Sequence, residues 1–152
     1  MSKDRTTTYE PLNAAGGVLY KYTAGELYVL LIYRKDVWDL PKGKQDDGED
    51  IRTCAIREVS EETASKPPRI THDLGTTNHS YTDKWGSFNK TTWWYAMTTD
   101  SKHFSPQRSE GITKICWKPV GEAFGLVGFD NLREVLERLI KVIPVKEPSH
   151  NK

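Results

Sequence analysis

Cysteine is scarce in this 152-residue chain, which contains only Cys54 and Cys116, far apart and without C-x-x-C spacing. This scarcity excludes a disulfide-rich scaffold and a cysteine zinc site, and it predicts free thiols in a reducing compartment. No apolar run approaches the roughly 20 residues that a membrane helix needs. The first ten residues, MSKDRTTTYE, are polar, unlike a signal peptide. We therefore expect a cytoplasmic protein with no membrane partner.

An excess of charge of one sign is also missing, because 22 basic residues face 21 acidic ones and the net charge is +1. Proteins that bind a nucleic-acid polymer usually carry a clear basic excess, so we expect no such partner. A small anionic ligand held by a few local lysines remains compatible with this balance. The four histidines show no metal-binding spacing, and we interpret them as structural or surface residues. Nothing in the sequence sets the oligomeric state.

Alternating and short apolar runs predict strands, and 3.6-residue periodicity predicts helices. The hydrophobic content of 36% and the length suit one domain, which we place at residues 12–144 between flexible termini at 1–11 and 145–152. Strands interleaved with helices indicate the α/β fold class. A polar segment at 100–110 is expected to be a mobile loop, and Asp130 is a plausible N-cap. The expected strands are 14–22, 27–33, 69–82, 87–99 and 112–117; the expected helices are 49–63, a short one from Pro119, and one around 132–140.

Three glutamates, Glu58, Glu61 and Glu62, share one face of the first expected helix because they stand at i, i+3 and i+4. Like charges at this spacing weaken a helix. A divalent cation such as Mg²⁺ would compensate for the repulsion, since hard ions take carboxylate oxygens. An acidic string alone would also fit a solvated helix face. Arg57 beside Glu58, and the glycine- and lysine-rich loop 42–48 before the helix, favour a site that binds a metal and phosphate.

The stretch from Gly43 to Ser65 resembles the Nudix box, G-x5-E-x7-R-E-U-x-E-E-x-G-U, where U is aliphatic. The lead-in 38–44, WDLPKGK, and the expected strand at 14–20 are also similar to that family. Ala64 and Ser65 depart from the pattern. Glycine at the first of these positions would end the helix with a positive φ angle, so we expect altered loop geometry there. The matching residues are Gly43, Glu49, Arg57, Glu58, Val59, Glu61 and Glu62.

The resemblance implies a Nudix-type α/β/α sandwich with a mixed β-sheet between helices. It also implies a Mg²⁺-dependent hydrolase of phosphoanhydride bonds, with Mn²⁺ as a possible substitute. Glu58, Glu61 and Glu62 would be the metal ligands, Arg57 would hold these carboxylates in place, and Glu49 would support them. A further carboxylate outside the box often serves as base or ligand. Glu110 is the candidate, and an exposed loop glutamate is the equally plausible alternative.

The substrate implied by the resemblance is a nucleoside diphosphate linked to another moiety. Tyr81 lies where members that split dinucleoside polyphosphates carry a tyrosine, so we favour that class. An oxidised nucleoside triphosphate, a diphosphoinositol polyphosphate and a nucleotide-sensing domain without catalysis are alternatives. Five aromatic residues cluster near the expected 83–86 turn, and one or two could stack on a base. The candidate phosphate contacts are Arg34, Lys42, Lys44 and Lys90.

Overall fold

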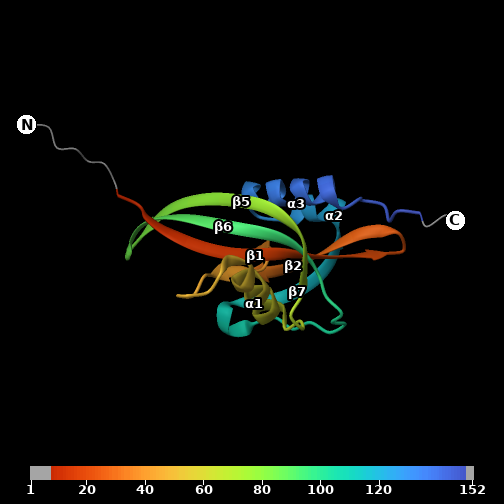
Figure 1. Ribbon diagram of the computed structural model, residues 1–152, viewed down its shortest axis with the longest axis horizontal. Coiled ribbons are helices and arrows are strands. Elements are labelled where there is room, and N and C mark those ends of the chain that lie inside the picture. Colours follow the sequence, from red (N-terminus) through yellow and green to blue (C-terminus); the bar gives the residue numbers. More distant parts are fainter. Residues whose placement is uncertain (1–7, 150–152) are drawn as a thin grey trace, which may run out of the picture.

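A mixed sheet of seven strands forms the centre of the computed structural model, which describes residues 8–149 (Figure 1). The strands are β1 (Glu10–Thr23), β2 (Glu26–Arg34), β3 (Val37–Asp39), β4 (Lys42–Lys44), β5 (Arg69–Asp83), β6 (Gly86–Thr98) and β7 (Ile112–Pro119). The helices are α1 (Ile51–Thr63), the 3₁₀ helix η1 (Arg108–Glu110), α2 (Val120–Leu126) and α3 (Asp130–Val142).

The sheet has the order β3-β2-β1-β6-β5, with β4 paired to β1 and β7 paired to β2. β1 and β6 run parallel, whereas the other pairs are antiparallel. Figure 1 shows α1 on one side of this sheet and α2 with α3 on the other. The predicted α/β/α sandwich with a mixed sheet is therefore confirmed.

Alternation along β6 divides the core into two layers, because successive side chains of a strand point to opposite faces. Trp94 and Ala96 pack into the layer under α2 and α3. Tyr95 and Met97 pack into the layer under α1. The α1 residues in the second layer are Cys54, Ala55 and Val59, as the helical spacing predicts.

Three local expectations need correction. The predicted loop 42–48 begins with the short strand β4, which pairs with β1 from Ala14 to Gly16. Asp130 is the first residue of α3 and not its N-cap; its carboxylate instead accepts a hydrogen bond from Arg133 at 2.7 Å. The segment 100–110 is held against the end of α1, because two of its amides donate to helix carbonyls.

The end of α1 keeps the geometry that a glycine would give, although Ala64 stands there. Its φ and ψ angles are 61° and 25°, in the left-handed region. Ser105 N donates to the carbonyl of Thr63 at 2.9 Å, and Gln107 N donates to that of Glu62 at 3.3 Å. These bonds satisfy carbonyls that a helix end leaves open. Our expectation of altered geometry was wrong, because these contacts outweigh the cost of placing alanine at positive φ.

Regular pairing reaches slightly beyond the predicted domain limits. β1 begins at Glu10, and the carbonyl of Val145 accepts a hydrogen bond from Leu27 N in β2. Glu147 N donates to the carbonyl of Gly25 in the turn between β1 and β2. The rest of the two segments predicted to be flexible, 1–7 and 150–152, lies outside the described residues. No helix within residues 8–149 combines the length and hydropathy required to span a membrane.

Candidate metal and phosphate site

Helix α1 carries the site, and its N-terminus is capped by Asp50, whose Oδ1 accepts from Thr53 N at 2.8 Å. Glu49 therefore precedes the helix, whereas the sequence predicted a helix that begins at residue 49 and includes both Glu49 and Asp50. One face of α1 packs on the sheet through Cys54 and Val59. Glu58 stands four residues after Cys54, and Glu62 stands three after Val59, so the helical repeat places both beside that packed face. Glu62 is accordingly buried with it.

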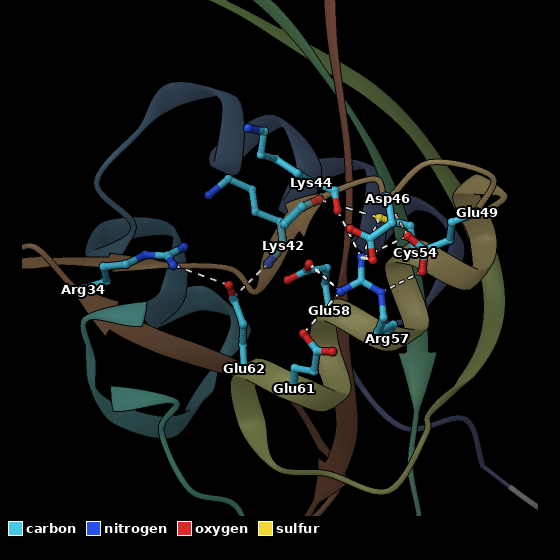
Figure 2. A network of polar contacts seen from close by, with 11 residues as sticks. Arg34, Lys42, Lys44, Asp46, Glu49, Cys54, Arg57, Glu58, Glu61 and Glu62 are labelled. Atoms are coloured by element: carbon cyan, nitrogen blue, oxygen red, sulfur yellow. Dashed lines mark hydrogen bonds and ion pairs between the residues drawn. The ribbon is translucent and has the colours of Figure 1, made fainter. Parts of the chain in front are cut away.

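Arg57 lies at the centre of a carboxylate network (Figure 2). Its Nε and Nη2 donate to Glu49 at 2.6 and 2.9 Å, and its Nη1 donates to Glu58 at 2.9 Å and to Glu61 at 3.2 Å. Nη2 also donates to the carbonyl of Lys44 at 3.1 Å, which links the helix to β4. The hydrogen bonds from Arg57 lower the pKa of Glu49 to about 2. Arg57 thus joins three of the box carboxylates to the strand before them.

Glu62 is buried, with 2% of its surface exposed, and it accepts Lys42 N at 3.1 Å and Arg34 Nη1 at 3.4 Å. Burial raises its pKa to about 7, and the two cations offset only part of this effect. Burial also raises the pKa of Glu58, against the influence of Arg57. A Cβ atom at Gly43 would overlap the Glu58 carboxylate, so the missing side chain makes room for it. Two desolvated carboxylates therefore lie close together beside β4.

The carboxylates of the half-buried Glu58 and the buried Glu62 line a cavity of about 800 Å³. Its floor follows the register across four strands: Lys44 lies opposite Ala14, Ala14 beside Thr92, and Thr92 opposite Thr77. The small floor residues leave a trough, and cationic side chains gather along it. The further lining residues are Arg34, Lys35, Val37, Asp39, Lys42, Gly43, Asp46, Glu58, Glu62, His79, Tyr81, Lys90, Trp94, Glu110, Phe129, Asn131 and Leu132.

Most of the predicted site residues meet in this cavity. Arg34, Lys42, Lys44, Tyr81, Lys90, Glu58, Glu62 and Glu110 all line it. Glu61 does not line it; its side chain is 47% exposed and turns towards Arg57. Among the aromatic candidates, Trp94 is buried and donates to Thr77, whereas Trp85 is 79% exposed at the hairpin turn. The structure thus leaves Tyr81 as the accessible aromatic candidate in the cavity.

Several lining residues were missed at the level of sequence, among them His79 and Asp39. His79 stacks on Tyr81 with ring centroids 5.6 Å apart, although we had interpreted it as structural or surface. Strand alternation could have found it, because positions 77, 79 and 81 share one face of β5. Asp39 ends β3 and contacts the side chains of Arg34 and Lys42. No periodicity in the sequence marks it, since its two partners come from other strands, Arg34 from β2 and Lys42 from β4.

The donor set fits a hard divalent cation. Mg²⁺ is commonly held by one or two carboxylates and completes its octahedral shell with water and substrate phosphates. Glu58 and Glu62 would supply two such carboxylates, and the desolvation of both favours a neutralising charge. Within residues 8–149, no three acidic, histidine or cysteine side chains already converge as a metal cage. The site therefore fits a metal ion that takes two ligands from the chain and its remaining ligands from water and a substrate.

Two curated proteins are similar to this chain in sequence. An 8-oxo-(d)GTP phosphatase from Mycolicibacterium smegmatis is 33% identical over 153 residues, covering 93% of this chain and 45% of that protein. An asymmetrical bis(5'-nucleosyl)-tetraphosphatase from Caenorhabditis elegans is 40% identical over 63 residues, or 40% of this chain and 46% of that protein. The chain thus spans less than half the length of either relative.

A solved structure, the NUDIX domain of Shewanella oneidensis NrtR complexed with ADP ribose, has the same fold. Its TM-score is 0.70 at 24% identity, and the match covers 91% of this chain and 92% of that one. The family model described as NUDIX domain matches residues 11–140, which includes every strand that carries the cavity and the whole of α1. With most of its length matched in this way, the chain belongs to the NUDIX domain family.

Proposed function

We propose that this chain is a Mg²⁺-dependent pyrophosphohydrolase that cleaves a nucleoside diphosphate linked to another moiety, and that it favours dinucleoside polyphosphates. The observation that carries this proposal is the continuity of one cavity. It joins the carboxylates of the half-buried Glu58 and the buried Glu62 to a row of cations and then to the His79–Tyr81 pair. Such an arrangement suits a ligand with a phosphate chain between a metal and an aromatic base.

Glu58 and Glu62 would hold the cation, with Glu61 as a further ligand from the rim and Mn²⁺ as a possible substitute for Mg²⁺. NUDIX family members generally use divalent cations. The bound ion would supply charge stabilisation at phosphorus and a more acidic water. Arg57 would keep the carboxylates of Glu58 and Glu61 from swinging away, since it donates to both.

The cations along the trough would bind the phosphate chain. Lys35, Lys44 and Lys90 line the cavity and form no ion pair within residues 8–149. Burial lowers the pKa of Lys90, because the charged ammonium has lost part of its hydration. Substrate phosphates would provide the counter-charge that these lysines lack. More than two phosphates are needed to match all of them, which favours a polyphosphate over a simple diphosphate.

Glu110 would act as the base that accepts a proton from the attacking water. It lies at the end of η1 on the cavity wall, and its charge contributes to raising the pKa of Glu58. Phosphoryl transfer depends mostly on positioning and charge stabilisation, so a carboxylate at the metal end is a suitable proton acceptor.

A second candidate substrate is an oxidised nucleoside triphosphate. The relative from M. smegmatis, which matches along almost the whole of this chain, carries that activity in its name. The same lysines and the Tyr81 ring would then bind a triphosphate and a single base. Diphosphoinositol polyphosphates remain a further alternative, as does a domain that senses a nucleotide without cutting it.

The test is a panel of substrates with millimolar Mg²⁺ and then with EDTA. The panel contains diadenosine tetraphosphate, 8-oxo-dGTP, ADP-ribose and a diphosphoinositol polyphosphate. We expect metal-dependent turnover with the highest kcat/KM for diadenosine tetraphosphate. A higher kcat/KM for 8-oxo-dGTP would favour the second candidate. Binding of a nucleotide without turnover of any substrate would instead support a domain that senses a nucleotide without cutting it.

The role of the helix glutamates is tested with Glu61→Gln, and Glu137→Gln on the exposed side of α3 is the matched control. We expect kcat to fall by about 10²-fold or more in Glu61→Gln, because a charged ligand is lost. The control should retain full activity. Equal turnover in both variants would remove Glu61 from the proposed metal site.

A further inference from the structure

Asp39 is a buried acid outside the box motif, with 5% of its surface exposed at the end of β3. Its Oδ1 accepts a hydrogen bond from Leu40 N at 2.7 Å. Its Oδ2 faces two cations, Lys42 Nζ at 3.2 Å and Arg34 Nη2 at 3.6 Å. A carboxylate is costly to bury unless it is paired and hydrogen-bonded, and Asp39 meets both conditions.

The same two cationic residues also contact Glu62. Lys42 donates through its backbone amide at 3.1 Å, and Arg34 donates through Nη1 at 3.4 Å. Figure 2 shows the Glu62 carboxylate between these two residues. Asp39, Arg34, Glu62 and Lys42 thus form a closed ring, in which each carboxylate contacts both cationic residues. The side chains of Arg34 and Lys42 are only 16% and 20% exposed, so little water can replace a lost partner.

We propose that Asp39 is a positioning residue of this site: it holds the side chains of Arg34 and Lys42, and thereby leaves the Glu62 carboxylate available to a divalent cation. Arg34 divides its guanidinium between the two carboxylates. Without the charge of Asp39, Glu62 becomes the main acidic partner of Arg34. The Arg34 guanidinium then competes with the metal ion for the Glu62 carboxylate. This inference rests on the proposed function, in which Glu62 is a metal ligand.

A purely local role for Asp39 makes a different prediction. Asparagine preserves the size of the side chain and the oxygen that accepts Leu40 N–H, while it removes the charge. If Asp39 serves only to shape the turn, Asp39→Asn will leave metal binding intact. If it restrains the two cations, the variant will weaken metal binding, and removal of Arg34 will relieve that loss.

The experiment measures Mn²⁺ binding to the full chain by calorimetry, without substrate. We expect Asp39→Asn to bind Mn²⁺ about tenfold more weakly, the size typical of residues that orient metal ligands. The double variant Asp39→Asn/Arg34→Met should recover affinity to within a few-fold of the wild type. Asp100→Asn, which removes an exposed carboxylate, is the matched control and should bind as the wild type does.

Unchanged affinity in Asp39→Asn would overturn the inference, and so would a loss that Arg34→Met fails to relieve. If Asp39→Asn does not fold, Asp39→Ser carries the same comparison, because its hydroxyl can still accept Leu40 N–H. A wild-type chain that binds no Mn²⁺ would also overturn the inference. Turnover by the wild type, together with unaltered Mn²⁺ binding in Asp39→Asn, would refute this inference and leave the proposed function standing. Mn²⁺ binding that follows the expected order, without turnover of any substrate, would refute only the proposed hydrolase activity.

Discussion

Arg57 and Glu49 are joined by two parallel hydrogen bonds, from Nε to Oε2 at 2.6 Å and from Nη2 to Oε1 at 2.9 Å. A bidentate pair of this kind is among the stronger polar contacts of a protein. It connects the helix α1 to the loop that precedes it. Because Arg57 also donates to Glu58 and Glu61, the proposed metal ligands, the same contact stabilises the fold and orders the proposed site.

The first prediction concerns acid stability. The pKa of Glu49 is lowered to about 2, so its stabilising effect is complete above its unfolded pKa and is lost as the pH falls towards 2. Glu49→Gln should lower the free energy of unfolding on the order of 2 kcal/mol at pH 7. The difference from the wild type should shrink between pH 4.5 and 2. Urea unfolding across this range provides the measurement, and a constant difference would contradict the assignment.

The second prediction concerns Glu62 and metal. Its pKa is raised to about 7, so the protonated carboxyl group is favoured in the folded protein. The free energy of unfolding therefore decreases as the pH rises from the unfolded pKa through 7. In EDTA we expect Tm to fall between pH 5 and pH 8. Millimolar Mg²⁺ should reduce this fall, because the ion competes with the proton for the carboxylate. In Glu62→Gln the effect of Mg²⁺ should be weaker and should change less with pH; an equal effect in both proteins would exclude Glu62 as a ligand.

The third prediction compares two glycines. A Cβ atom at Gly43 would overlap only the end of the Glu58 side chain, which can move, whereas one at Gly16 would meet the backbone carbonyl of Pro41. Gly43→Ala should therefore keep its Tm but lose about tenfold or more in Mn²⁺ affinity. Gly16→Ala should lose about 1–3 kcal/mol of stability from overpacking. Denaturation and calorimetry distinguish the two, and equal behaviour of the variants would be inconsistent with this geometry.

The fourth prediction concerns the end of α1. Ala64 has a φ angle of 61°, a conformation that glycine adopts without steric cost. Ala64→Gly should stabilise the protein by about 0.5–1 kcal/mol. Gly125→Ala, within α2 and with nothing within 4 Å of the added Cβ atom, is a useful comparison, because alanine favours a helix. A lower Tm for Ala64→Gly would indicate that the bonds from the 100–110 segment alone set this turn.

The fifth prediction concerns Lys90, which lines the cavity and has no ion-pair partner within the described residues. Lys90→Met keeps the stem of the side chain and removes the charge. We expect KM for a polyphosphate substrate to rise by about tenfold, while the Mn²⁺ affinity of the free protein stays the same. Lys102→Met, at an exposed position, is the control. An unchanged KM in Lys90→Met would remove this lysine from the phosphate site.

Local sequence determined much of the scaffold. The spacing of the three glutamates needs only the 3.6-residue helical repeat, so their place on one common face of α1 followed from the chain itself. The alternation of β6 likewise divided its residues between two core layers. Helix limits were less certain by one or two residues, because capping depends on individual side-chain bonds such as that of Asp50 with Thr53.

Tertiary structure alone decided which residues share the cavity. Lys90 and His79 meet because they are register partners where β6 pairs with β5. They share a cavity with the glutamates of α1 because β1 pairs with β6 on one side and with β4 on the other. The same holds for Asp39, whose burial and partners arise where the end of β3 packs beside two other segments. Periodicity in a sequence reports which face of an element is apolar, whereas the pairing of distant elements sets which polar side chains converge and lose their water.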